Sequence, residues 1–230
     1  MDPRRARRRA DLAIDRDALY RHRFGPDVSA GRSAMWREIG RHLQRYIPRD
    51  SAVLDLAAGS GQFIANISAR ERWASDMRDT SAEMPADVTF VCADGLALRD
   101  HLPLGHFDRV FMSNYLEHLH SREAVVEQLA VVRDLLKVSG RVIVLQPNVR
   151  LTGGRYWDFI DHHTALTERS LEEAALTAGL EPVKTITRFL PYTTKSRLPQ
   201  AAWLVRLYLS FPPAWWLMGK QTLFIAQRTT

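Results

Sequence analysis

Residues 53–61 read VLDLAAGSG, a short apolar run followed at once by a turn that contains Gly59 and Gly61. By its length and flanks, the run at 52–56 predicts a buried strand, and we expect a helix from Gln62 to about Ala69. Glycines in such a turn let the backbone approach a ligand closely, and a helix N-terminus beyond them favours an anionic group. This unit predicts an α/β fold with a ligand at the end of the strand.

The same alternation continues along the chain. The sequence predicts further strands at 71–75, 88–92, 108–112, 141–146, 183–190 and 222–227, and its clearest helices at 121–138 and 170–178. The first helix is expected to begin at Ser121 and stop at Gly140, and the second to open with a capping box of Ser170 and Glu173. Alternating strands and helices predict a doubly wound, mostly parallel sheet of seven strands. In such sheets the ligand lies at the rim formed by the carboxyl ends of the strands.

The length of 230 residues and the 46% hydrophobic content predict one α/β domain with additions. We expect a basic disordered tail at 1–10 and an N-terminal helical lid at 11–48, broken at Gly25-Pro26 and at Gly31. The domain itself is expected at 49–230, with insertions on the substrate side at 147–166 and 191–221.

The net charge of +6 is uneven, because five arginines lie within residues 1–9. A nucleic-acid-binding surface is therefore not expected, and the tail is either a solubilising arm or a contact for anionic lipid or nucleic acid. No apolar segment of a secretory signal follows the arginines, so we expect a cytoplasmic protein. Cys92 is the only cysteine, which excludes an internal disulfide and argues against a cysteine-ligated zinc site.

Acidic residues recur where the first three strands end, at Asp55, Asp76 and Asp94. A carboxylate after the second strand suits a ribose diol, because it can accept two hydroxyl hydrogen bonds. The dinucleotide pattern G-x-G-x-x-G would need glycine where Ile64 stands, so a nicotinamide-dependent reductase is a remote alternative. The other alternative is an ordinary strand–helix turn with surface acids.

With these motifs the chain resembles the class I S-adenosylmethionine-dependent methyltransferases. VLDLAAGSG is similar to their first motif, D-x-G-x-G-x-G, with Ala57 in place of the first glycine. Residues 107–119 (FDRVFMSNYLEHL) and 135–144 (LLKVSGRVIV) resemble their fourth strand with its turn and their passage into the fifth strand. The resemblance implies that the seventh strand is antiparallel and lies between the fifth and sixth.

The resemblance also implies S-adenosylmethionine as cofactor and S-adenosylhomocysteine as product. The first motif would shape the methionine pocket, the acid after the second strand would hold the ribose, the segment after the third would hold the adenine, and the turn after the fourth would line the methyl-transfer mouth. The cofactor-binding residues implied in this way are Asp55, Ala57, Gly59, Gly61, Asp76, Asp94, Gly95, Asn114 and Tyr115.

Two later segments, 156–163 (YWDFIDHH) and 188–199 (RFLPYTTKSRLP), resemble a bacterial subgroup encoded beside glycosyltransferases of surface-glycan pathways. This favours a small-molecule or saccharide acceptor, including a lipid-carried one, with methylation on oxygen. Methylases of exocyclic base amines carry Pro-Pro-aromatic after the fourth strand, whereas this chain has Asn114-Tyr115-Leu116. A nucleic-acid substrate is therefore not expected.

The candidate catalytic residues are Asp161, His162 and His163 after the fifth strand, and His118 after the fourth. A histidine beside a carboxylate can be held in one tautomer and accept a proton near neutral pH. The alternative is that these side chains only fix their loops. No metal is expected, because no further ligand is visible in the local sequence.

The insertion at 191–221 is rich in large apolar side chains. It should gather them near the substrate entrance: Trp203, Leu204, Leu207, Tyr208, Phe211, Trp215 and Trp216. The helix predicted at 201–209 either packs on the domain, pairs in a homodimer, or contacts a membrane surface through 199–218.

A second kind of function is open to the same fold. The chain could bind the cofactor without transferring a methyl group, as a cyclase or as a binding partner, because one scaffold hosts many functions.

Overall fold

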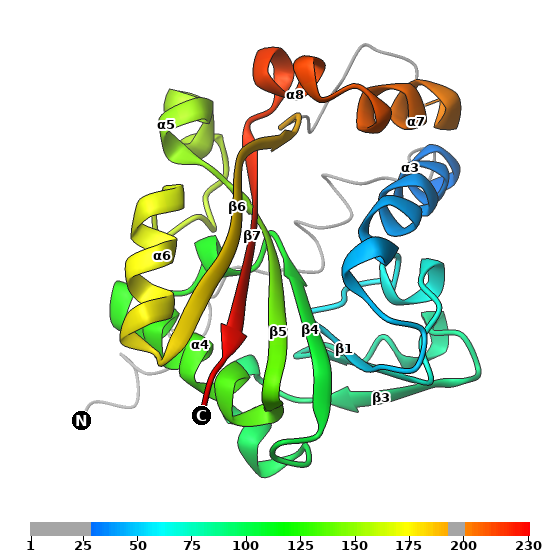
Figure 1. Cartoon of the computed structure of the whole chain (residues 1–230), viewed down its shortest axis with the longest axis vertical. Coiled ribbons are helices and arrows are strands. Elements are labelled where there is room, and N and C mark those ends of the chain that lie inside the picture. Colours follow the sequence, from blue (N-terminus) through cyan, green and yellow to red (C-terminus); the bar gives the residue numbers. More distant parts are fainter. Residues whose placement is uncertain (1–28, 193–200) are drawn as a thin grey trace, which may run out of the picture.

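Seven strands form one sheet in the order β3-β2-β1-β4-β5-β7-β6 in the computed structural model of the chain (Figure 1). Their bounds are β1 (Ala52–Leu56), β2 (Glu71–Asp76), β3 (Val88–Cys92), β4 (Phe107–Ser113), β5 (Leu136–Pro147), β6 (Leu180–Leu190) and β7 (Gln221–Arg228). The first five strands pair in parallel, and β7 runs antiparallel to both β5 and β6. The predicted fold class is confirmed, including the last strand inserted between the fifth and sixth.

The structure describes residues 29–192 and 201–230. The predicted basic tail at 1–10, the lid from 11 to 28 with Gly25-Pro26, and residues 193–200 lie outside the described residues.

Helices cover both faces of the sheet (Figure 1). On one face α4 (Arg122–Leu135) and α6 (Glu168–Thr177) pack over a core that includes Leu54 and Leu129. On the other face lie α3 (Ser29–Leu43), α7 (Ala202–Ser210) and α8 (Pro212–Met218), over a core that includes Val53 and Leu43. Successive residues of β1 enter opposite cores, which is why all five of its side chains are buried and apolar or paired.

The strand register brings the functional loops to one rim. Leu56 at the end of β1 pairs with Ser75 of β2 and with Met112 of β4. Farther along the rim, Asp76 pairs with Cys92 of β3. The loops after β1, β2, β3, β4 and β5 therefore leave the sheet side by side, as the sequence predicts for a ligand site.

The helix predicted from Gln62 to Ala69 is wrong. The segment forms turns and one 3-10 helix, η3 (Ile64–Asn66). Its backbone groups bond to side chains from other segments: Arg72 donates to the carbonyl of Ile64 (3.0 Å), and Gln44 pairs with both the N–H and the carbonyl of Ser68. These partners replace the bonds that would have propagated an α-helix.

Two predicted helix ends are also corrected. Helix α4 begins after Ser121 as expected, but it ends at Leu135, because residues 136–140 already belong to β5. Helix α6 begins at Glu168, and its capping box is formed by Thr167 with Ser170 rather than by Ser170 with Glu173.

Gly31 lies inside α3 and does not break it. Helix α3 is joined to α7 through Glu38, which accepts hydrogen bonds from Arg206 (3.1 Å) and from Arg41. A short helix, α5 (Val149–Thr152), follows β5. Among the described residues, none of the helices has the length and apolar character needed to cross a membrane.

Candidate functional site

The loop after β1 contains three residues in the left-handed region: Ala57 (φ 55°), Gly59 (φ 57°) and Gly61 (φ 66°). A Cβ on Gly61 would lie 2.5 Å from Sδ of Met84, whereas a Cβ on Gly59 would meet nothing within 4 Å. The backbone at Gly59 therefore faces open space, as a cradle for a ligand requires. Ala57, which replaces a motif glycine, adopts the glycine conformation all the same.

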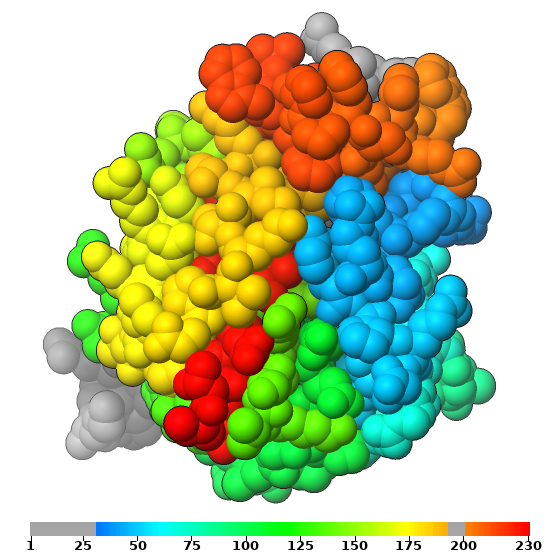
Figure 2. All heavy atoms as spheres, in the orientation of Figure 1, coloured from blue at the N-terminus to red at the C-terminus, as the bar shows by residue number. Residues whose placement is uncertain are grey.

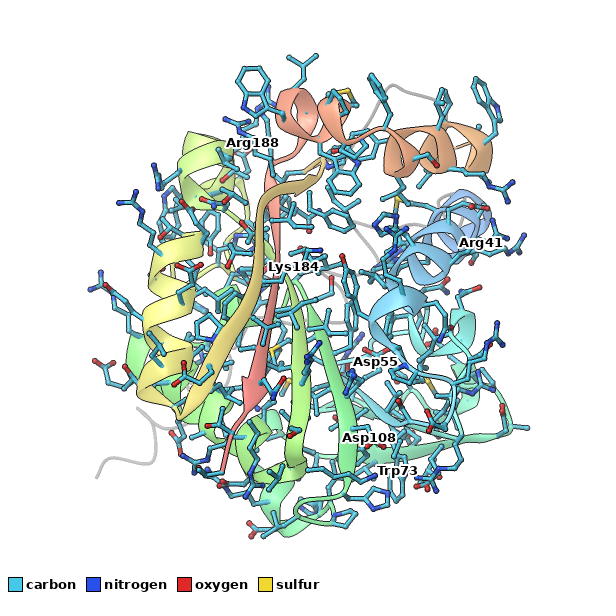
Figure 3. All side chains as sticks on the ribbon, in the orientation of Figure 1. Arg41, Asp55, Trp73, Asp108, Lys184 and Arg188 are labelled. Atoms are coloured by element: carbon cyan, nitrogen blue, oxygen red, sulfur yellow. The ribbon has the colours of Figure 1, made fainter. Side chains whose placement is uncertain are left out.

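Asp55 lies one residue before the end of β1 and is 3% exposed (Figure 3). Its Oδ2 accepts a hydrogen bond from the N–H of Ile64 (3.3 Å). Burial raises the pKa of Asp55 well above its usual range, and the charge of Asp76 acts in the same direction. This hydrogen bond ties the Asp55 carboxyl group to the backbone that follows the glycine loop.

Asp76, the last residue of β2, holds the glycine loop from the other side. Its Oδ2 accepts the N–H of Gly59 (2.9 Å), and its Oδ1 accepts the N–H of Arg78 (3.0 Å). The two oxygens of a carboxylate offer about four acceptor positions. Hydroxyls of a ribose could therefore bind here without displacing the loop.

Asp94 and Gly95 follow β3. Asp94 accepts the N–H of Leu96 (2.9 Å) and caps the 3-10 helix η5 (Gly95–Asp100). A Cβ on Gly95 would lie 2.2 Å from the hydroxyl oxygen of Tyr115, so a larger residue would require that side chain to move. Gln128 of α4 accepts from that hydroxyl (2.7 Å) and donates to the carbonyl of Gly95 (3.1 Å).

The loops after β4 and β5 meet in a second group of polar side chains. Nδ1 of His118 lies 2.9 Å from the backbone carbonyl oxygen of Asp161 and 3.4 Å from its Oδ2. The ring of His118 lies against that of His162, with 5.1 Å between centroids. The candidate residues of two separate loops are therefore brought together, and Asp161 orients His118.

Glu117, which precedes His118 in the sequence, belongs to the same group of side chains. It is 1% exposed, and Gln146 of β5 donates a hydrogen bond to its Oε2 (3.0 Å). Its backbone carbonyl accepts the N–H groups of His163 (2.8 Å) and Thr164 (3.1 Å), which fastens the two loops together. Burial raises the pKa of the Glu117 carboxyl.

Two predicted site residues, His163 and Tyr115, have partners outside the group of His118. The ring of His163 lies against that of His120, 4.4 Å between centroids, and does not join the ring of His118. Tyr115 uses its hydroxyl to bind Gln128. Asn114, in contrast, stands on the rim with φ 49° and donates to Oγ of Ser113 (2.9 Å).

Two glutamines act in these sites without having been predicted. Gln128 and Gln146 are both buried, and each ties a site residue to the framework. The signal was present: Gln128 interrupts the apolar face of α4, and Gln146 ends an apolar run in β5. A buried polar side chain needs a partner, so such positions point to a site nearby.

Comparison with known proteins identifies the family of this chain. The methyltransferase domain family matches residues 30–185. No curated protein matches this sequence.

Solved structures share the fold at low identity. A SAM-dependent methyltransferase from Archaeoglobus fulgidus is 19% identical with a TM-score of 0.62, covering 93% of this chain and 100% of that one. The 1,6-didemethyltoxoflavin-N1-methyltransferase of Burkholderia thailandensis, solved with bound 1,6-didemethyltoxoflavin and S-adenosylhomocysteine, is 21% identical with a TM-score of 0.60, covering 93% of this chain and 86% of that one. The [4+2]-cyclase SpnF is 17% identical with a TM-score of 0.58, covering 84% and 80%. The chain belongs to the methyltransferase domain family, and it is a class I S-adenosylmethionine-dependent methyltransferase.

Proposed function

We propose that the protein methylates a hydroxyl group of a small molecule or saccharide. The observation that carries this proposal is the pairing of His118 with Asp161 beside His162, on the rim that also holds the glycine loop. Transfer to a hydroxyl requires that the hydroxyl lose its proton, whereas an amine or activated carbon needs little beyond alignment. A polar group of this kind suits an oxygen acceptor.

S-adenosylmethionine, when bound, supplies a methyl group on a positively charged sulfur. The residues of the chain then have three tasks: to hold the cofactor, to align the acceptor oxygen with the methyl carbon, and to stabilise the oxygen as its proton leaves. Asp76 and the loop of Gly59 and Gly61 serve the first task. The group of His118, Asp161 and His162 serves the third.

Release of S-adenosylhomocysteine tests the function directly. The purified chain is incubated with S-adenosylmethionine and a panel of sugars, nucleotide sugars and phenols, with amines as the contrasting class. We expect release with a hydroxyl acceptor, and a loss of about 100-fold in kcat in His118→Gln. His120→Gln is the matched control and should retain activity, since its exposed ring lies outside the group of His118. Turnover with amines alone would contradict the proposal of an oxygen acceptor.

The cyclase SpnF, which has a similar fold, is the reason to keep a second candidate function. A protein of this fold that binds the cofactor without methyl transfer would bind S-adenosylmethionine and S-adenosylhomocysteine in a calorimetric titration. It would release no S-adenosylhomocysteine with any acceptor class. That pair of results would replace methyl transfer by this alternative.

We further propose that α7 and α8 contact a membrane surface, in keeping with a lipid-carried acceptor. Helix α7 packs on the domain through Leu209, and α8 through Trp215. The two helices form one end of the molecule (Figures 1 and 2). The exposed large apolar side chains of the two helices and of the residue that joins them are Trp203 (66%), Leu207 (60%), Phe211 (57%), Trp216 (74%), Leu217 (73%) and Met218 (39%). Tryptophans are typical of the boundary between lipid and water, and the exposed Arg206 adds attraction to anionic lipid.

Co-sedimentation with vesicles of phosphatidylcholine and phosphatidylglycerol tests the membrane contact. We expect the full chain to sediment with anionic vesicles, and Trp203→Ser with Trp216→Ser to remain in the supernatant. Trp73→Phe, on the distant strand β2, is the control for loss of a tryptophan. Equal recovery in the supernatant with and without vesicles would contradict the membrane contact. Elution of the protein as a dimer in size-exclusion chromatography would indicate instead that a second copy of the chain covers this face.

A further inference from the structure

Glu117, His118 and His162 form a compact set of metal-ligating side chains. One ligand atom from each of them lies within 4.8 Å of the others. Ligands on a single zinc ion at bond lengths of about 2.1 Å are roughly 3.4 Å apart, so small side-chain rotations would complete the geometry. The sequence predicts no metal because 161–163 alone offers too few ligands, and the fold adds Glu117 and His118 from the loop after β4.

Hydrogen bonds to neighbouring groups orient two of these ligands, His118 and Glu117. With Nδ1 of His118 directed at Asp161, Nε2 is the ring nitrogen left to carry the lone pair. Gln146 binds Oε2 of Glu117, which leaves Oε1 for another partner. Metal-bound histidines and carboxylates are typically oriented by hydrogen bonds of this kind.

The surroundings of the set are closed and partly aromatic. The rings of Tyr156 and Phe159 lie 4.8 Å and 5.0 Å from that of His162, between centroids. Glu117 is 1% exposed and His162 9% exposed, while His118 is half-buried and gives access from the rim. A buried carboxylate is costly in free energy unless a positive charge lies beside it, and a divalent ion would supply two.

We propose that Glu117, His118 and His162 bind a divalent transition-metal ion. Two imidazoles and one carboxylate are the ligand set of zinc and non-haem iron sites, whereas magnesium and calcium prefer oxygen ligands throughout. Three protein ligands leave a fourth coordination position open. The role of the ion rests on the proposed function: an acceptor hydroxyl bound at the open position would have a lowered pKa, its proton would pass to solvent, and the oxygen would take the methyl group as the S–CH₃ bond of the cofactor breaks and S-adenosylhomocysteine leaves.

Metal titration of the tag-free full chain tests the site independently of turnover. The protein is stripped with a chelator and titrated with Zn²⁺ by calorimetry and with Co²⁺ by visible absorption, with Mg²⁺ as a third arm. We expect one equivalent of Zn²⁺, d–d absorption bands for Co²⁺, and no heat from Mg²⁺. Glu117→Gln, His118→Gln and His162→Gln should each weaken Zn²⁺ binding at least 100-fold. Asp161→Asn, which acts through His118, should weaken it about 10-fold.

His120→Gln is the control, because this exposed histidine lies two residues from His118 and outside the set. Absence of stoichiometric binding by the wild-type chain, or equal weakening in His120→Gln, would overturn the proposal. The wild-type Co²⁺ spectrum decides the question even where a variant fails to fold, since a coordinated ion absorbs and a loosely attracted one does not. Titration of the same sample with S-adenosylhomocysteine separates the two failures: cofactor binding without metal binding removes the metal site and leaves the methyltransferase.

Discussion

Ala57 has φ 55°, a backbone conformation that costs an L-residue roughly 1–2 kcal/mol. Ala57→Gly should remove that cost, partly offset by the greater freedom of glycine in the unfolded chain. We expect the free energy of unfolding to rise by about 0.5–1 kcal/mol. Urea denaturation measures it. Ala58→Gly, at a neighbour without positive φ, should lower stability instead, and a fall in both variants would show that the loop at Ala57 carries no strain.

Asp76 should matter for the cofactor more than for the fold. Asp76→Ala removes an acceptor for ribose hydroxyls and for the N–H of Gly59, so we expect S-adenosylmethionine to bind at least about tenfold more weakly. Calorimetric titration gives the dissociation constant. Asp79→Asn, in the exposed turn that follows β2, should leave it within about twofold. An unchanged constant in Asp76→Ala would refute the ribose assignment.

Single site residues could be predicted from the sequence where the local chemistry requires one residue type. Asp55, Gly61 and Gly95 could be predicted because a buried acid or an absent Cβ is needed there. The joining of His118 to Asp161 could not, because the two residues are 43 positions apart and meet only when β4 and β5 pair.

Among the elements, α3 carries a buried histidine that resists protonation. His42 is 7% exposed and packs against the rings of both Phe189 of β6 and Trp215 of α8. Burial lowers the pKa of His42 to about 4, and the charges of Arg45 and Lys184 act in the same direction (Figure 3). In the unfolded chain the group titrates near pH 6.5.

Stability should therefore fall as the pH drops from about 6.5 toward 4, because only the unfolded chain takes up the proton in that range. The loss can reach about 3 kcal/mol at full effect. His42→Phe keeps an aromatic ring against Phe189 and Trp215 and removes the titrating group, so it should flatten the decline between pH 6.5 and 5. Denaturant unfolding at several pH values measures this. Parallel curves for the two proteins would show that His42 does not cause the decline.

Helices and strands could be predicted where their own residues determine them, and could not where residues distant in sequence do. The apolar run of β1 gave correct bounds because burial on both faces needs several apolar residues in succession. The bounds of β3 were also correct, although this edge strand is only partly buried. The segment 62–69 was wrong because Arg72 and Gln44, which are distant in sequence, bind its backbone. Likewise α4 ends early because β5 takes over residues 136–140.

In the molecule as a whole, the last strand is fastened to the far end of α4. Nη1 of Arg228 donates to the carbonyls of Leu136 (2.7 Å) and Arg133 (3.1 Å). Cations stabilise the C-terminus of a helix, and hydrogen bonds to charged groups are worth about 1.5–3 kcal/mol. Arg228→Met should lower the free energy of unfolding by about 1–2 kcal/mol, since the side chain is partly exposed.

Guanidinium denaturation of Arg228→Met against the wild type measures the difference. Arg122→Met, at the opposite end of the same helix, is the control and should change stability by less than about 0.5 kcal/mol. Equal changes in the free energy of unfolding at the two ends would mean that the loss of a positive charge, and not the loss of the hydrogen bonds to the helix carbonyls, accounts for the lower stability.

The position of β7 has a consequence for how the chain is made. β7 follows β5 and β6 in the chain, yet it lies between them in the sheet and pairs with both. Until it emerges, the nascent chain carries two unpaired strand edges, one on each side of a gap, and unpaired edges invite association with other chains. The seven-stranded sheet therefore closes only after β7 has been made.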